Sequence, residues 1–293
     1  MTWEPEGGQP VTLHGSGPWE GGGPYFFRRL TSDLGATAES SRAPRQDGVT
    51  TYHVALDSRT INLEGSMLVY GDRLHPADGE YDRARSRLCE LFAPNRWGTL
   101  TYYRACSAVQ VRCRSLSTPT ISAPVGTYSE IDVSFAADSP YWESAEETVE
   151  ELGVIRKLRR FPLSPVRAPM GSFSPIAVLQ NQTAVDIYPT IEVLSTGRRV
   201  TVSNLGTGES VTIEHSIEEG QKLVIDMRDV TAILWEKDET GLWSRKDDVS
   251  HWMSLDSTPW CLRPGESRIT ISNEAPEETP VAYIRYREPC LGV

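Results

Sequence analysis

The chain has 293 residues, a formal net charge of −11, 39% hydrophobic residues and 24% charged residues. This balance is typical of a globular protein rather than a disordered one, and a length of this size favours two domains of roughly 100–200 residues each. The acidic charge argues against a bulk nucleic-acid binder, which needs a basic surface to neutralise phosphates. Because no apolar run approaches about 20 residues, and the opening MTWEPEGGQP has no apolar core, we expect neither a membrane span nor a Sec signal peptide.

The N-terminal half predicts short strands and one helix. Its first residues are dense in Gly and Pro, which favours loops and short strands. Alternating or β-branched and aromatic segments predict strands at 50–56, 60–70, 98–103, 108–116 and 129–136. Residues 78–92 predict an amphipathic helix, with Tyr81, Ala84, Leu88, Leu91 and Phe92 on one face. A helix of this kind would cover one open face of an antiparallel sheet.

The middle of the chain differs from both halves. Residues 143–151 form an acidic run, and residues 154–167 are basic and interrupted by Pro, so we interpret this region as an interdomain connector. Beyond it, strands are predicted at 190–194, 199–204, 209–217, 222–226, 231–236, 268–273 and 282–287. Many short strands separated by turn residues predict a β-sandwich or jelly roll. Residues 238–248 read as an exposed loop and a candidate contact site.

The residue patterns contain no recognisable catalytic or metal-binding motif. The five cysteines, at 89, 106, 113, 261 and 290, include no CxxC, so we interpret them as reduced, structural thiols. The five histidines, at 14, 53, 75, 215 and 251, form neither HExxH nor HxH, and there is no GxSxG or SxxK. We therefore predict no catalytic residue, no metal and no cofactor.

Four tryptophans, Trp235, Trp243, Trp252 and Trp260, are the one conspicuous chemical feature of the C-terminal half. Two interpretations stay open. Aromatic side chains carry much of the buried area in small domains, so the tryptophans are suited to the core. On the surface of a β-sandwich they would form a platform on which sugars stack, and Trp243 and Trp252 are the candidate glycan or partner contacts.

Ordered segments along both halves resemble one known family. The N-terminal half contains QDG at 46–48, SRTINLEGSML at 58–68, LFAPNRWGTLTYY at 91–103, VRCRSLSTPTI at 111–121 and IDVSFAADSPYWES at 131–144. The C-terminal half contains a stretch from Tyr188 to Asp229 and WCLRPGESRITIS at 260–272. In this order they resemble the distal tail protein (Dit) family of siphoviruses, also called the siphovirus-type tail component family. One departure is Ser139, where the family commonly runs Asp-Pro-Tyr without interruption.

The resemblance implies a mainly β protein and a structural role in the virion. It implies a small sheet or barrel-like domain with one helix at 1–145, a connector at 146–175, and a galectin-like or carbohydrate-binding-module-like jelly roll at 176–293. The family forms a hexameric ring at the tail tip. The ring connects the tail tube protein to the tail-associated lysin or tail hub and to the receptor-binding protein, with DNA only passing through the channel. Such a protein is assembled in the host cytoplasm, has no membrane partner and is not an enzyme.

Two other functions compete with this one. A carbohydrate-binding adhesin of the tail tip would use the C-terminal sandwich and its tryptophans. A polysaccharide-degrading enzyme would need two carboxylates that face each other across a groove. The shared sandwich architecture does not decide among them, because small β-sandwiches support many functions.

Overall fold

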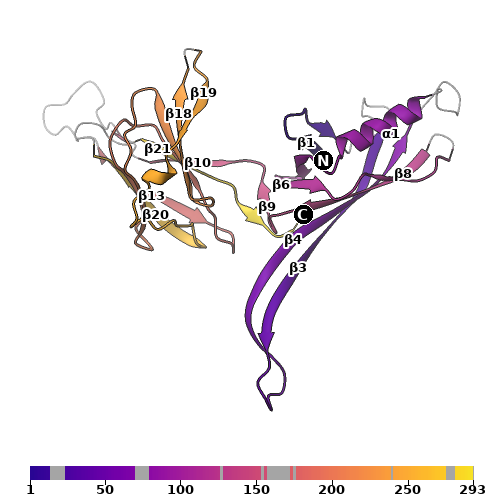
Figure 1. Ribbon diagram of the computed structural model, residues 1–293, viewed down its shortest axis with the longest axis horizontal. Coiled ribbons are helices and arrows are strands. Elements are labelled where there is room, and N and C mark those ends of the chain that lie inside the picture. Colours follow the sequence, from indigo (N-terminus) through magenta and orange to yellow (C-terminus); the bar gives the residue numbers. More distant parts are fainter. Residues whose placement is uncertain are drawn as a thin grey trace. The chain divides into compact units, whose positions relative to one another are not determined.

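The structure is a computed structural model that describes residues 1–13, 24–69, 79–125, 128–152, 155–156, 172–173, 176–238, 240–274 and 281–292. The chain divides into two compact units. Unit 1 comprises Met1–Ala145 and Cys290–Val293, and unit 2 comprises Glu146–Pro289. The protein is mainly β, with several antiparallel sheets and, among the described residues, one short α-helix (Figure 1).

Unit 1 is built on a ten-stranded antiparallel sheet. Its principal strand order is β2-β1-β5-β6-β8-β4-β3, with β7, β9 and β22 paired beside this path. The bounds are β1 Thr2–Pro5, β2 Val11–Thr12, β3 Tyr25–Ser41, β4 Thr50–Leu68, β5 Trp97–Tyr103, β6 Ala108–Ser115, β7 Thr120–Ile121, β8 Tyr128–Ala137, β9 Trp142–Ser144 and β22 Pro289–Cys290.

Strict alternation in the central strands of unit 1 places one face of the sheet in the core. Ile61 and Leu63 of β4 are fully buried, and Ile61 pairs in register with the buried Phe135 of β8. Neighbouring side chains along a strand point to opposite faces, so this spacing of two selects the buried face. Phe135 also meets Trp3 of β1 and Phe92, with ring centroids 5.1 and 5.5 Å apart. Aromatic residues from three segments that are distant in the sequence thus pack together in one core.

The predicted helix forms as α1, Glu80–Leu91, within the 78–92 segment. Leu88 is buried, and Tyr81, Ala84 and Leu91 pack against the core of unit 1. The Trp3 indole N–H donates to the Leu91 carbonyl at 3.2 Å, which fixes the end of α1 on the sheet. Asp78 lies outside the described residues, and the N-cap position is Gly79.

Strands β3 and β4 extend beyond the sheet as a two-stranded arm (Figure 1). Pairing of β4 with β8 starts at Arg59, so residues 50–58 of β4 pair with β3 alone. The predicted strands at 50–56 and 60–70 are therefore one continuous strand of 19 residues, and its partner β3 was not predicted. We define residues 35–58 as the arm.

The buried Arg59 side chain marks the root of the arm. It is 2% exposed and donates to three segments that are far apart in the chain. Nη1 donates to the Ser32 hydroxyl at 2.6 Å, Nε and Nη2 donate to the Pro140 carbonyl at 2.9 and 2.7 Å, and Nη2 also donates to the Leu291 carbonyl at 2.6 Å. A guanidinium presents its donors in a rigid fork, so these bonds hold β3, the turn after β8 and the C-terminal residues together.

Unit 2 contains two antiparallel sheets that enclose one hydrophobic core. The six-stranded sheet has the order β10-β21-β14-β17-β18-β19, and the four-stranded sheet has the order β13-β20-β15-β16. The bounds are β10 Thr148–Leu152, β13 Ile176–Asn181, β14 Thr190–Val193, β15 Val200–Asn204, β16 Glu209–Ile213, β17 Gln221–Asp226, β18 Thr231–Lys237, β19 Trp243–Asp248, β20 Gly265–Ser272 and β21 Ala282–Tyr286. A separate pair joins β11 Ile155–Arg156 and β12 Ser172–Phe173.

The segment 238–248 differs from the exposed loop that its polar sequence predicts. Residues 243–248 form β19, which pairs with β18 at the edge of the six-stranded sheet. Both faces of this strand are polar, so it lacks the alternation that reveals a strand, and backbone pairing with β18 supplies its order. Charged residues on an edge strand also protect its unpaired backbone groups from adventitious pairing.

The chain passes between the units twice. It leaves unit 1 after Ala145, and Cys290–Val293 belong to unit 1 again, where β22 pairs with β9. Residues 148–152 of the proposed connector form β10, which pairs with β21 in unit 2, and residues 157–171 lie outside the described residues. The boundaries 1–145, 146–175 and 176–293 stay a proposal about domains.

We expect Arg59→Met to lower the free energy of unfolding by about 2–3 kcal/mol, because the substitution removes the charged donor of four part-buried hydrogen bonds at the root of the arm. Amide hydrogen exchange in the arm should speed up as its root loosens. Urea unfolding and hydrogen-exchange mass spectrometry of the full chain measure both effects.

Arg29→Met is the matched control. Arg29 also lies in the β3–β4 hairpin, but its side chain is exposed and forms an ion pair with Glu64 at 3.7 Å. Surface pairs contribute about 0–1 kcal/mol, so we expect a small change. Equal stability of the two variants would contradict the role assigned to Arg59.

Candidate functional site

The arm exposes an apolar face that nothing in unit 1 covers. Tyr52, Val54 and Leu56 alternate along β4 and are 70, 58 and 40% exposed. Residues two apart on a strand share a face, and Ala36 and Ala38 of β3 pair in register with Leu56 and Val54. The opposite face is polar, with a Thr37 hydroxyl that donates to Asp57 at 2.8 Å and with His53 in register with Glu39. The arm is therefore amphipathic although both faces are exposed.

This apolar face is a candidate assembly surface. An isolated two-stranded hairpin is marginally stable in water, and exposed groups of large apolar side chains mark interaction sites. Sequence reasoning found the β4 part of the surface as strand 50–56. It missed β3, because Tyr25–Ser41 has little apolar alternation beyond its first residues and owes its extended form to pairing with β4.

The two predicted tryptophan contacts lie on different elements. Trp243 begins β19, is partly buried and stands beside Lys222 of β17, whose Nζ is 5.0 Å from the Trp243 ring centroid. Trp252 ends the short 3₁₀-helix η2, Ser250–Trp252, and is 47% exposed. Its ring is flanked by His215 and His251, with centroids 6.0 and 5.4 Å away. Trp260 belongs to the core, where it is 1% exposed.

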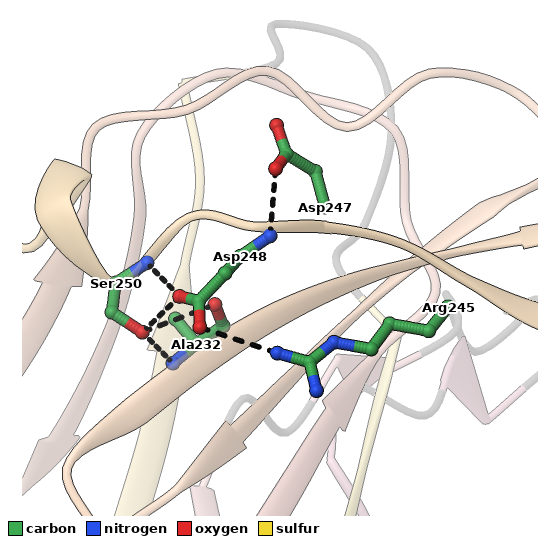
Figure 2. Close-up of polar contacts among 5 residues, drawn as sticks. All are labelled: Ala232, Arg245, Asp247, Asp248 and Ser250. Carbon is green, nitrogen blue, oxygen red and sulfur yellow. Dashed lines mark hydrogen bonds and ion pairs between the residues drawn. The ribbon is translucent and has the colours of Figure 1, made fainter.

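A small polar cluster fixes η2, and with it Trp252, on β18 (Figure 2). Asp248 Oδ1 accepts from the Ser250 hydroxyl at 2.6 Å and from the Ser250 amide at 3.1 Å. The Ala232 amide donates to the Ser250 hydroxyl at 2.9 Å, and Arg245 pairs with Asp248 Oδ2 at 3.3 Å. The hydrogen bonds from Ser250, helped by the charge of Arg245, hold the pKa of the Asp248 carboxyl below its usual value.

Other chemistry is sparse in the part of the chain that the structure describes. No three His, Cys, Asp or Glu side chains gather there as a metal site. No helix within those residues has the length and hydropathy to span a membrane. None of the five cysteines is paired with another, and burial raises the pKa of the Cys113 thiol well above its usual value. His14 and His75 lie outside the described residues.

Comparison with known families finds one likeness, in the C-terminal part of the chain. Residues 182–288 match the family model described as siphovirus-type tail component, C-terminal domain. No curated protein sequence matches the chain.

Solved structures share the fold over almost the whole chain. The crystal structure of the Dit protein (gp 19.1) of phage SPP1 has a TM-score of 0.66 and 13% identity, and covers 99% of each chain. A chain of the phage P2 baseplate in its activated conformation with Ca has a TM-score of 0.58 and 11% identity over 100% of this chain and 99% of that chain. The corresponding baseplate structure with Sr has a TM-score of 0.56 and 10% identity over 100% and 99%.

The Asp248 cluster predicts a pH dependence with a definite sign. Because the folded-state pKa of Asp248 lies below that of the unfolded chain, its contribution to stability is present above the unfolded value of about 3.9 and is lost as pH falls through the folded value. We expect Asp248→Asn to melt at a lower temperature than the unaltered chain at pH 7, with the difference vanishing at strongly acidic pH. Asp256→Asn, at an exposed loop position, is the control and should show no such convergence.

Proposed function

We propose that this chain is a member of the siphovirus-type tail component family and builds the hub of a phage tail tip by assembling copies of unit 1 through the arm. It is a structural protein of the phage tail and baseplate, not an enzyme. The observation that carries the assignment is the agreement of two likenesses, a family match over residues 182–288 and a shared fold along nearly the whole chain. The SPP1 protein is described as a paradigm of the hub adsorption apparatus in phages that infect Gram-positive bacteria.

The assembly we propose is a closed hexameric ring. In a ring each subunit offers one surface to a different surface of the next, so one face of unit 1 must be complementary to another. The amphipathic arm supports this arrangement, since its apolar face needs a cover and its length lets it reach beyond its own sheet. The free edge of β3, the last strand in the sheet order, offers unpaired backbone groups to a neighbour.

Further partners follow from a place at the tail tip. We propose the tail tube protein on one side of the ring, the tail-associated lysin or tail hub on the other, and the receptor-binding protein at the periphery. DNA would pass through the channel without being gripped, which suits a chain of net charge −11. Assembly would take place in the host cytoplasm.

Unit 2 is best interpreted as a jelly roll of the galectin or carbohydrate-binding-module type, and the unit 1 sheet as barrel-like in the ring. Support for the jelly roll comes from two antiparallel sheets around one core and from a chain that moves repeatedly between them, as from β13 to β14 and from β14 to β15. Trp243 and Trp252 stay candidate contacts for a glycan or for another tail protein.

The location at the tail tip can be tested on the virion. Gold-labelled antibodies against the full chain should bind at the end of the tail, and phage that lack the gene should produce tails without a tip structure. Labelling of the capsid or along the tail shaft would contradict the assignment.

The role of the arm can be tested with two adjacent substitutions on β4. Val54→Lys places a charge on the apolar face and should abolish tip assembly and reduce the phage titre at least tenfold. Ala55→Lys places the same charge on the polar face, on the side of Asp57, and should leave the titre unchanged. Both purified variants should melt as the unaltered chain does, because both positions are exposed. Equal titres of the two variants would contradict docking through the apolar face.

A further inference from the structure

One face of the six-stranded sheet in unit 2 carries two tryptophans around a lysine. Lys222 of β17 has its Nζ 5.8 Å from the ring centroid of Trp235 on β18 and 5.0 Å from that of Trp243 on β19. Lys222 pairs in register with Trp235, and Trp243 pairs with Lys237, two residues further along β18. Because residues two apart share a face, both indoles stand on the same side of the sheet. Trp235 and Trp243 are partly buried, and each keeps part of its ring at the surface.

A row of paired charges continues from this lysine across the sheet. Lys222 Nζ binds Glu192 Oε1 of β14 at 3.1 Å, and Glu192 Oε2 binds Arg285 Nη2 of β21 at 3.0 Å. Arg285 Nη1 then binds Glu147 Oε2 at 3.0 Å. Glu192 and Lys222 are each only 15% exposed. Each charge is thus held in place by its neighbours, next to the two indoles.

We propose that this face, formed by Trp235, Trp243, Lys222, Glu192 and Arg285, binds a neutral glycan. The aliphatic face of a pyranose ring is flat and apolar and stacks on an indole, while its hydroxyl groups exchange hydrogen bonds with carboxylates, ammonium and guanidinium groups. The surface offers both kinds of group side by side. A neutral ligand fits best, because each acidic group already has a basic partner and a charged ligand would have to break one of these ion pairs.

Trp243 therefore acts with Trp235, whereas Trp252, flanked by its own two histidines, lies outside this face. The inference rests on the proposed place at the tail tip, where a ring presents several copies of the face toward a bacterial surface. Single sites on an open sheet face bind weakly, but linking them raises the effective affinity by about 10²–10⁴.

A glycan array provides the first test. The full chain, coupled to a multivalent bead, is applied to an array of bacterial surface polysaccharides. We expect binding to at least one neutral glycan, a loss of about tenfold or more in each of Trp235→Ala and Trp243→Ala, and unchanged binding in the control Leu255→Ala, whose side chain is fully exposed. No binding to the array, or equal losses in all three variants, would overturn the proposal.

Lysine NMR provides a second readout that does not depend on a substitution. The chain has only four lysines, at 157, 222, 237 and 246, so reductive ¹³C-methylation gives few signals. The soluble form of the bound glycan should shift the ring-flanked signal of Lys222. It should leave that of Lys246, which pairs with Glu236, in place. Movement of the Lys246 signal alone would contradict the site. Failure of both tests would leave the tail-tip assignment standing, since the virion labelling examines it separately.

Discussion

The outer half of the β3–β4 hairpin lacks a third strand, and much of unit 1 can be understood from that constraint. Residues 50–58 of β4 make ladder hydrogen bonds to β3 alone, so the arm has two open edges and two exposed faces. A ribbon of this kind has little burial to offset the entropy of ordering its backbone. Contact of the ribbon with another protein surface would supply the missing burial. The arm is therefore the part of unit 1 that is least stabilised by contacts within the chain, and it is suited to contacts with another subunit.

The Arg59 side chain fixes the direction in which the ribbon leaves the sheet. Beyond the last pair with β8, β4 has only β3 beside it, and two register irregularities, between Leu34 and Ala36 and between Glu39 and Ser40, interrupt the ladder of this ribbon. A buried guanidinium bonded to Ser32, Pro140 and Leu291 ties the root of the ribbon to a turn and to the C-terminal residues. Because Leu291 follows unit 2 in the sequence, the contacts of Arg59 join segments of unit 1 that lie on both sides of unit 2 along the chain.

The sequence predicted those elements whose side chains alternate between core and solvent. In β4 and β8, residues such as Leu63 and Phe135 alternate with polar neighbours because one face of the sheet is buried, and the helix around Leu88 follows the same logic at a different period. Strands β3 and β19 escaped prediction because pairing with a neighbour, rather than burial, orders them. Hydrophobic periodicity records burial, so it does not reveal a polar strand that is ordered by backbone pairing with its neighbour.

The sequence pattern also predicts the positions of the tryptophans only in part. Their clustering along the chain raised both a core and a surface interpretation, and the structure uses both, with Trp260 buried and Trp243 on the sheet face. Trp243 of β19 and Trp235 of β18 form one surface because both rings lie beside Lys222, which is on β17, the next strand in the sheet order. The charge row from Lys222 to Glu147 likewise joins strands that are adjacent only in the sheet. A binding face assembled across a sheet depends on strand order, and strand order is the property that a local pattern does not encode.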